Sequence, residues 1–153
     1  MTDFYRSKGL SCAPCYKDTK AALRWLEEAF GFEPFMVILD KDENLAHAEM
    51  RFGDSVLMVA SEWTERHRSP ASTGGINTQT IHVQLDDDID AHCERARKAG
   101  ANITQEPETQ FYGDRTYRCI DPEGHIWTFG QTVQKSTPDD WQKATGLRTQ
   151  ARL

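Results

Sequence analysis

The feature that most constrains this sequence is a helix pattern that occurs twice, about 70 residues apart. The first predicted helix runs from Asp18, a favourable N-cap, to about Phe30, and Gly31 follows where a left-handed C-cap is wanted. Apolar residues recur along it every three or four positions. A second helix repeats the pattern, with an aspartate at its start and a glycine at its end: Asp88 or Asp90, and Gly100. The chain is therefore expected to contain two similar units.

Strand candidates surround each predicted helix in the same order, one before it and three after it. In the first half they are residues 10–16, 33–39, 46–52 and 56–60, and in the second half residues 80–85, 101–104, 116–120 and 126–131. Both halves thus read β-α-β-β-β, as an internal duplication would produce. The domains expected are an N-terminal extension (1–9), a first module (10–60), a polar linker with a mobile loop (61–79), a second module (80–133) and a C-terminal tail (134–153).

Charge and composition exclude several classes of partner. A net charge of −6 over 153 residues leaves no basic face for nucleic acid or for an anionic membrane. The sequence shows neither an export signal nor a long apolar run, so we expect a soluble, cytoplasmic protein with reduced cysteines. Cys12 and Cys15 have the C-x-x-C spacing of thioredoxins, but only eleven residues precede them, and a structural strand is favoured.

Several segments of the sequence together resemble one family. The most specific is Asp121–Phe129, and the others are Asp18–Glu33, Gly53–Met58, Asp88–Ala91, Ala99–Ala101 and Tyr112–Arg115. Their order and spacing resemble the glyoxalase, bleomycin-resistance and extradiol-dioxygenase (vicinal oxygen chelate) superfamily. The resemblance implies an α+β fold of two β-α-β-β-β modules, which form curved mixed sheets around a shared pocket, within a homodimer.

The resemblance also locates the positions where metal-dependent members carry His, Glu or Gln ligands. Here these positions fall on Ser11, Met58, Thr80 (or Ile81) and Thr128. None is a good ligand for a divalent ion, so a cofactor is not expected. His82 is the main challenge to this expectation, since a one-residue bulge could bring it toward the third position. The pattern is closest to the PhnB-like and antibiotic-binding branch, whose pockets often lack a metal.

Candidate ligand-binding residues follow from strand alternation, which places Thr80, His82 and Gln84 on one face of their strand. His47 and Glu49 alternate in the same way with apolar neighbours. Met58 and Thr128 are expected in the pocket wall, and Tyr112 and Arg115 in a loop over its mouth. His82 and Glu49 are the catalytic candidates, should the protein be an enzyme. The alternative is that these are solvated or hydrogen-bonded strand residues without chemistry, as expected for His67 and His92.

The sequence favours a metal-independent pocket that binds a small organic molecule, for drug or metabolite sequestration. An enzyme of the same superfamily stays open as an alternative: a lyase, isomerase or dioxygenase that acts on a small carbonyl or aromatic substrate. A protein-binding module with a decayed pocket is a third possibility. The ligand is a small molecule in the first two cases, and no partner other than a second copy is implied.

Overall fold

The computed structural model describes residues 9–153, so the expected N-terminal extension lies outside the described residues except for Gly9. The first module contains β1 (Cys15–Tyr16), α1 (Thr19–Phe30), β2 (Glu33–Leu39), β3 (Leu45–Phe52) and β4 (Ser55–Ser61). The second contains β5 (Ile81–Gln84), α2 (Ile89–Lys98), β6 (Asn102–Thr109), β7 (Asp114–Ile120) and β8 (Ile126–Thr132). The predicted α+β fold with two β-α-β-β-β modules is confirmed.

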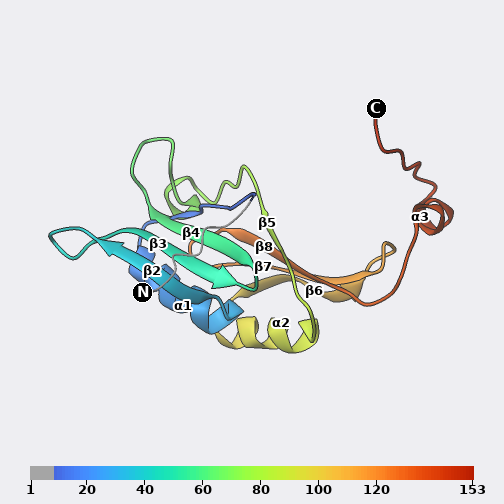
Figure 1. The fold of residues 1–153 in the computed structure, drawn as a ribbon, viewed down its shortest axis with the longest axis horizontal. Helices are drawn as coiled ribbons and strands as arrows, with labels where there is room; N and C mark the ends of the chain where they lie inside the picture. The colour runs from blue at the N-terminus through green and yellow to red at the C-terminus, as the bar shows by residue number, and fades with distance from the viewer. Residues whose placement is uncertain (1–8) are drawn as a thin grey trace.

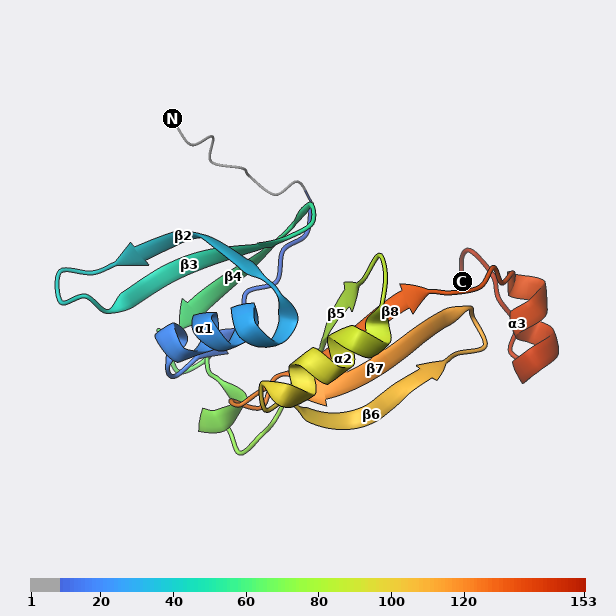
Figure 2. The same ribbon diagram turned by 90° about the horizontal axis from the view of Figure 1, so that it is seen from below.

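Each module forms one mixed four-stranded sheet, in the orders β1-β4-β3-β2 and β5-β8-β7-β6. The first strand of each module pairs in parallel with the last, and the other pairs are antiparallel. Figures 1 and 2 show the two sheets side by side, with α1 and α2 together on one side of them. Within the described part of the chain, no helix covers the opposite face of either sheet, and we call these two surfaces the open faces.

Local chemistry explains how the helices begin and end. Asp18 accepts a hydrogen bond from the backbone N–H of Ala21, and Gly31 adopts the left-handed conformation that ends α1. Asp88 caps α2 in the same manner through Ala91. Both helices therefore begin at the aspartates that the sequence pattern indicated.

The lengths of two strands, β1 and β6, differ from prediction by more than two residues, and each has a proline within or just before it. β1 has two residues rather than the predicted seven, because Pro14 has no N–H to donate and pairing before it is reduced to an isolated bridge at Cys12. β6 extends to Thr109 although Pro107 lies within it. It is an edge strand with register shifts, where a missing N–H is tolerated.

The two modules share one hydrophobic core, centred on Phe30 at the end of α1. Its ring lies 5.5 Å from that of Phe32 in its own module, and 5.1 Å and 4.7 Å from those of Trp127 and Phe129 in the other, between ring centroids. All four side chains are buried. Because these rings pack as one cluster, the modules are held in a fixed relative position.

Polar contacts reinforce this junction. The buried carboxylate of Asp121 accepts hydrogen bonds from Tyr16 Oη (2.7 Å) and Trp127 Nε1 (3.1 Å). The guanidinium of Arg95 on α2 donates to the carbonyl oxygens of Glu27 and Glu28 (2.8 Å and 2.7 Å) in the last turn of α1, and the Glu27 oxygen also accepts the N–H of Gly31. A cation at a helix C-terminus also complements the helix dipole.

His92 lies in this junction rather than in solvent, contrary to prediction. Its Nε2 lies 3.1 Å from the Phe30 carbonyl oxygen, and its Nδ1 lies 2.8 Å from Tyr117 Oη. A neutral ring satisfies both contacts if Nε2 donates to the carbonyl and Nδ1 accepts from the tyrosine.

Segments 61–79 and 134–153 flank the open faces. The linker is anchored by the buried Ser69, whose hydroxyl donates to Glu123 (2.7 Å) and whose N–H donates to Glu62 (2.8 Å). In the tail, α3 (Pro138–Thr145) is capped at both ends, buries none of its residues and stands away from the modules (Figure 1). Among the described helices, none has the length and apolar character needed to cross a bilayer.

We predict that His92 weakens folding at mildly acidic pH. Burial, together with the nearby Arg95 guanidinium, lowers the pKa of His92 below its ordinary value of 6.5. The unfolded chain then binds more protons than the folded chain, so this stabilisation is complete above about pH 6.5 and is lost as pH falls toward the folded pKa. Urea unfolding across this range should show a larger loss of unfolding free energy for the wild type than for His92→Gln. Equal losses would contradict the prediction.

Candidate functional site

The open face of the first sheet carries a histidine, a carboxylate and a thioether. His47, Glu49 and Met58 lie on this face, because Ala48 and Met50 between them are buried on the opposite side. Glu49 pairs directly with Met58 across β3 and β4. His47 Nε2 lies 3.3 Å from Glu49 Oε1, and their side chains are 32% and 18% exposed. This pair can hold or move a proton at the surface of the sheet.

A groove of about 680 Å³ lies at the outer end of this face, and we call it the sheet-one groove. Its walls come from β3 and β4 and from the linker, and its lining includes Ala13, His47, Met58, Ala60, Trp63 and His67. The sequence indicated His47 and Met58 but missed Trp63 and His67. A tryptophan within a polar linker was the signal that could have revealed them.

The open face of the second sheet carries a row of polar side chains that form two hydrogen-bonded groups. His82 pairs directly with Thr128, and its Nε2 lies 3.1 Å from Gln84 Oε1. Gln84 Nε2 donates to Asp114 Oδ2 (3.1 Å), and Arg118 Nε donates to Thr128 Oγ1 (3.2 Å). Arg118 was not anticipated from the sequence, where it is one of several polar residues on its strand.

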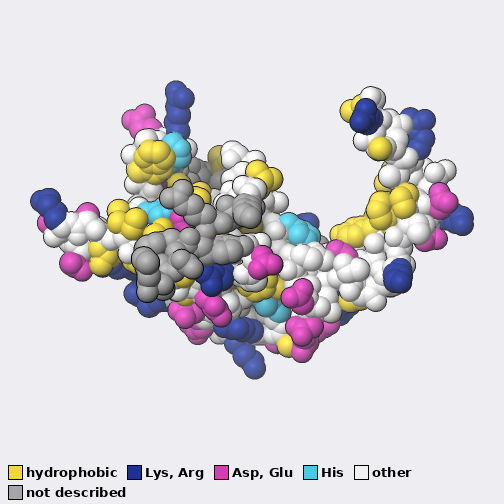
Figure 3. All heavy atoms as spheres, in the orientation of Figure 1, with side chains coloured by type: hydrophobic (Ala, Val, Ile, Leu, Met, Phe, Trp, Pro, Cys, Tyr) yellow, Lys and Arg dark blue, Asp and Glu magenta, His cyan; other side chains and the backbone are white. Residues whose placement is uncertain are grey.

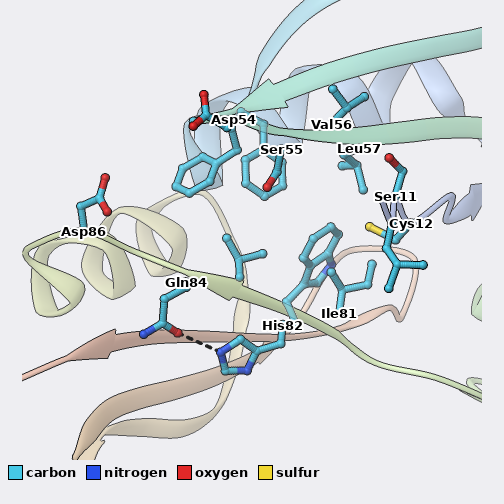
Figure 4. Close-up of a pocket in the computed structure, with 16 residues that line it drawn as sticks. Ser11, Cys12, Asp54, Ser55, Val56, Leu57, Ile81, His82, Gln84 and Asp86 are labelled. Carbon is cyan, nitrogen blue, oxygen red and sulfur yellow. Dashed lines mark hydrogen bonds between the residues drawn. The ribbon is translucent and has the colours of Figure 1, made fainter. Parts of the chain in front are cut away.

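A cavity of about 460 Å³ lies between the modules, beside β5, and its lining includes Ser11, His82 and Gln84 (Figure 4). Figure 4 shows Ile81 directed toward Leu57 and Cys12, while His82 and Gln84 lie on the other side of the strand. Burial raises the pKa of Cys12 and of Cys15, so both side chains stay protonated near neutral pH. The C-x-x-C segment therefore supplies no thiolate nucleophile, and all four cysteines are free.

The predicted set is only partly assembled in one chain. His47, Glu49 and Met58 lie on the first sheet, and the other set, His82, Gln84 and Thr128, lies on the second. The open faces of both sheets point to the same side of the molecule. Histidine and hydrophobic side chains are visible on that side in Figure 3. Thr80 precedes β5 and is exposed. Tyr112 lies in the turn between β6 and β7, with its ring against Phe111.

Arg115 is separated from the rest of the predicted set. It lies on the helix-covered side of β7, and its guanidinium forms two hydrogen bonds with the carboxylate of Asp90 on α2 (2.9 Å and 2.7 Å). These bonds lower the pKa of Asp90 and raise that of Arg115. Strand alternation explains the difference. Thr116 and Arg118 share one face of β7, and Arg115 points from the other face. We leave Arg115 out of the site.

The side chains at the family's metal positions do not fit a divalent ion. The strand pairing brings His82, rather than Thr80, beside Thr128 without any bulge. This imidazole has the Thr128 hydroxyl and the side-chain oxygen of Gln84 (3.1 Å) as its neighbours, and Arg118 donates to that hydroxyl with a positive charge that opposes a metal ion. Met58, on the other sheet, offers a thioether where hard cations prefer oxygen. Among residues 9–153, no group of three or more His, Cys, Asp or Glu side chains could hold a metal.

Comparisons with known proteins agree with this architecture. An uncharacterized protein of Mycobacterium bovis is 31% identical over 131 residues, which cover 83% of this chain and 85% of that protein. The crystal structure of TioX from Micromonospora sp. ML1 is 28% identical with a TM-score of 0.65, covering 85% of this chain and all of TioX. The fosfomycin resistance protein FosX of Mesorhizobium loti shares the fold alone, at 18% identity and a TM-score of 0.57, with 88% and 97% of the two chains covered.

The family match spans most of the described chain. The model of the Glyoxalase/Bleomycin resistance protein/Dioxygenase superfamily matches residues 11–129, from the start of the first module through the linker into β8, the last strand of the second module. The tail that carries α3 lies beyond the match. On this match, and on the sequence relatives, the chain belongs to the glyoxalase/bleomycin resistance protein/dioxygenase superfamily.

Proposed function

We propose that this protein binds a small organic molecule over its open faces without a metal ion, and so sequesters a drug or a metabolite. The observation that carries the proposal is the row from Arg118 through Thr128 and His82 to Gln84. It supplies hydrogen-bond donors and one positive charge at the place where metal-dependent members carry ligands. Arg118, His82 and Gln84 are exposed and Thr128 is half-buried, so their directional donors are accessible to the oxygen atoms of a polar ligand.

The sheet-one groove complements this row with apolar surface. Met58 and Ala60 are half-buried on the open face, and the groove volume of about 680 Å³ lies in the range of small-molecule pockets. A ligand with both an apolar body and a polar edge matches the two surfaces. Four free cysteines and a net charge of −6 are consistent with a cytoplasmic location and with no role in binding nucleic acid or membranes.

A homodimer completes this proposal. Within one chain the two open faces lie side by side rather than opposite each other (Figure 2), so neither encloses a ligand alone. A second copy related by a two-fold axis would set its second sheet over the first sheet of its partner. Each pocket would then combine His47, Glu49 and Met58 with the partner's His82 and the partner's Thr128.

One contact favours catalysis as an alternative. The 3.3 Å separation of His47 Nε2 and Glu49 Oε1 suits a general acid–base pair that acts on a carbonyl substrate, as in a lyase or isomerase. Turnover of a bound carbonyl compound that stops in Glu49→Gln, with binding retained, would make the protein an enzyme.

We predict that divalent metals do not stabilise the protein. Protein purified without a His-tag should contain no tightly held ion, and nickel, zinc, manganese or iron(II) should leave Tm unchanged, because one imidazole beside a guanidinium is a poor site. The double variant Met58→Glu, Thr128→Glu adds two carboxylates at the family positions and serves as the matched comparison. About one ion per subunit, with Tm rising with metal concentration, would refute the metal-free proposal.

We predict that a ligand which engages the second sheet depends on Arg118. A thermal-shift screen of small organic molecules, bleomycin and fosfomycin included, should yield a compound that raises Tm by about 5–10 °C at about 100 times its Kd. Arg118→Met should weaken its binding by about tenfold or more, through loss of a charge-assisted hydrogen bond. Arg97→Met is the control, since Arg97 pairs with Glu106 on the other side of the molecule. Equal binding by all three proteins would exclude the second sheet from the site.

We predict that the open faces form the dimer interface. Val37 and Ile38 are neighbours on β2 with equal exposure (47%), but Ile38 pairs with His47 on the open side and Val37 pairs with Ala48 on the other. Ile38→Asp should therefore shift the protein toward monomer in sedimentation velocity, because it buries a charge in the interface. Val37→Asp should not. Monomeric wild-type protein, or equal effects of the two variants, would disprove this interface.

A further inference from the structure

The linker presents one large aromatic side chain in a fixed position. Trp63 is 68% exposed, yet its ring packs on that of His67, with centroids 4.1 Å apart and planes inclined by 32°. His67 is held in turn by Thr64, whose Oγ1 lies 2.6 Å from His67 Nδ1 and whose carbonyl oxygen accepts the His67 N–H (3.2 Å). The Trp63 ring is therefore held by stacking on one ring while most of its surface stays available for contact with another aromatic ring.

The fold does not need this tryptophan. Trp25 and Trp127 serve the junction, where their indole N–H groups donate to the Ala99 carbonyl and to Asp121. Trp63 lies two residues beyond the end of β4 and belongs to neither module. Because Trp63 is mostly exposed, it contributes little to the core. The surroundings that remain to be considered are those of the sheet-one groove, which it lines.

Trp63 and His67 form one wall of the sheet-one groove, and Met58, Ala60 and His47 belong to its floor. The groove thus offers an aromatic face on one side and a polarizable thioether with a methyl group on the other. A planar ring can contact both, since aromatic rings stack on tryptophan and sulfur contacts aromatic rings favourably. A flexible or saturated chain gains less from this shape.

We propose that Trp63, supported by His67, is the stacking platform for a planar aromatic group of the ligand. This inference rests on the proposed small-molecule function and names the ligand class: compounds with a flat aromatic ring system. The ring lies in the sheet-one groove against Trp63, and its polar substituents extend along the open face.

The test uses two bicyclic probes of similar size, 2-naphthol and decahydro-2-naphthol, which differ in aromaticity. Binding is followed by NMR through the four tryptophan indole N–H resonances, and Trp63→Phe identifies the Trp63 signal. The Trp63 resonance should shift with 2-naphthol, while those of Trp25 and Trp127 stay in place. Decahydro-2-naphthol should bind about tenfold more weakly, near the upper range for one aromatic pair.

Variants separate stacking from simple apolar contact. Trp63→Ala should weaken 2-naphthol binding by about tenfold, and Trp63→Phe should retain it within about threefold. Trp141→Ala is the matched control, because Trp141 lies on α3 away from the groove. Trp63→Ala at wild-type affinity, equal binding of the two probes, or an unmoved Trp63 resonance would overturn the inference.

The outcomes also distinguish this inference from the proposed function. A compound whose binding depends on Arg118 but is indifferent to Trp63→Ala would leave the proposed function standing and refute the platform. Binding of 2-naphthol that depends on Trp63 but not on Arg118 would support the platform and confine the site to the first sheet. Failure of every compound in both assays would refute both.

Discussion

The packing of Phe30 against both modules is the contact on which the rest of the structure depends. Phe32 lies on one side of its ring, and Trp127 and Phe129 come from the other module. This cluster holds α1 and α2 together on one side of the molecule, so both open faces turn to the other side (Figure 1). Arg95 strengthens the same junction, because it donates two hydrogen bonds to carbonyl oxygens in the last turn of α1. A site assembled from two sheets requires this fixed angle.

The sequence predicts the fold well because its signals are local. Asp18 and Gly31 mark the ends of α1 through capping chemistry, and the alternation of β3 separates His47 and Glu49 from buried neighbours. The site is harder to predict, since it depends on pairing between distant strands. Nothing local shows that His82 lies beside Thr128, or that Arg115 is bound by Asp90 on a helix. Successive residues of a strand point to opposite faces of the sheet. A difference of one position therefore decides whether an arginine lies on the open face or on the helix-covered face.

The replacement of metal ligands by hydrogen-bonding groups changes what the shared fold can do. A divalent ion polarises an oxygen atom strongly, whereas Arg118 and Gln84 supply weaker and more directional contacts. Such contacts suit recognition better than bond cleavage. The His47–Glu49 pair is the exception, because it can transfer a proton without an ion. The residues on the open faces thus favour the proposed binding function, with proton transfer as the alternative.

The linker carries chemistry that neither module provides. A duplicated unit repeats the same strands and helix, so differences between members concentrate in segments outside the repeat. Here such a segment is anchored to the second module by the hydrogen bond from Ser69 to Glu123, and a second bond joins Ser69 to Glu62 within the linker. Trp63 and His67 lie at the start of this segment, where β4 ends. Under the proposed function, the linker therefore adds an aromatic surface to the groove that β3 and β4 line.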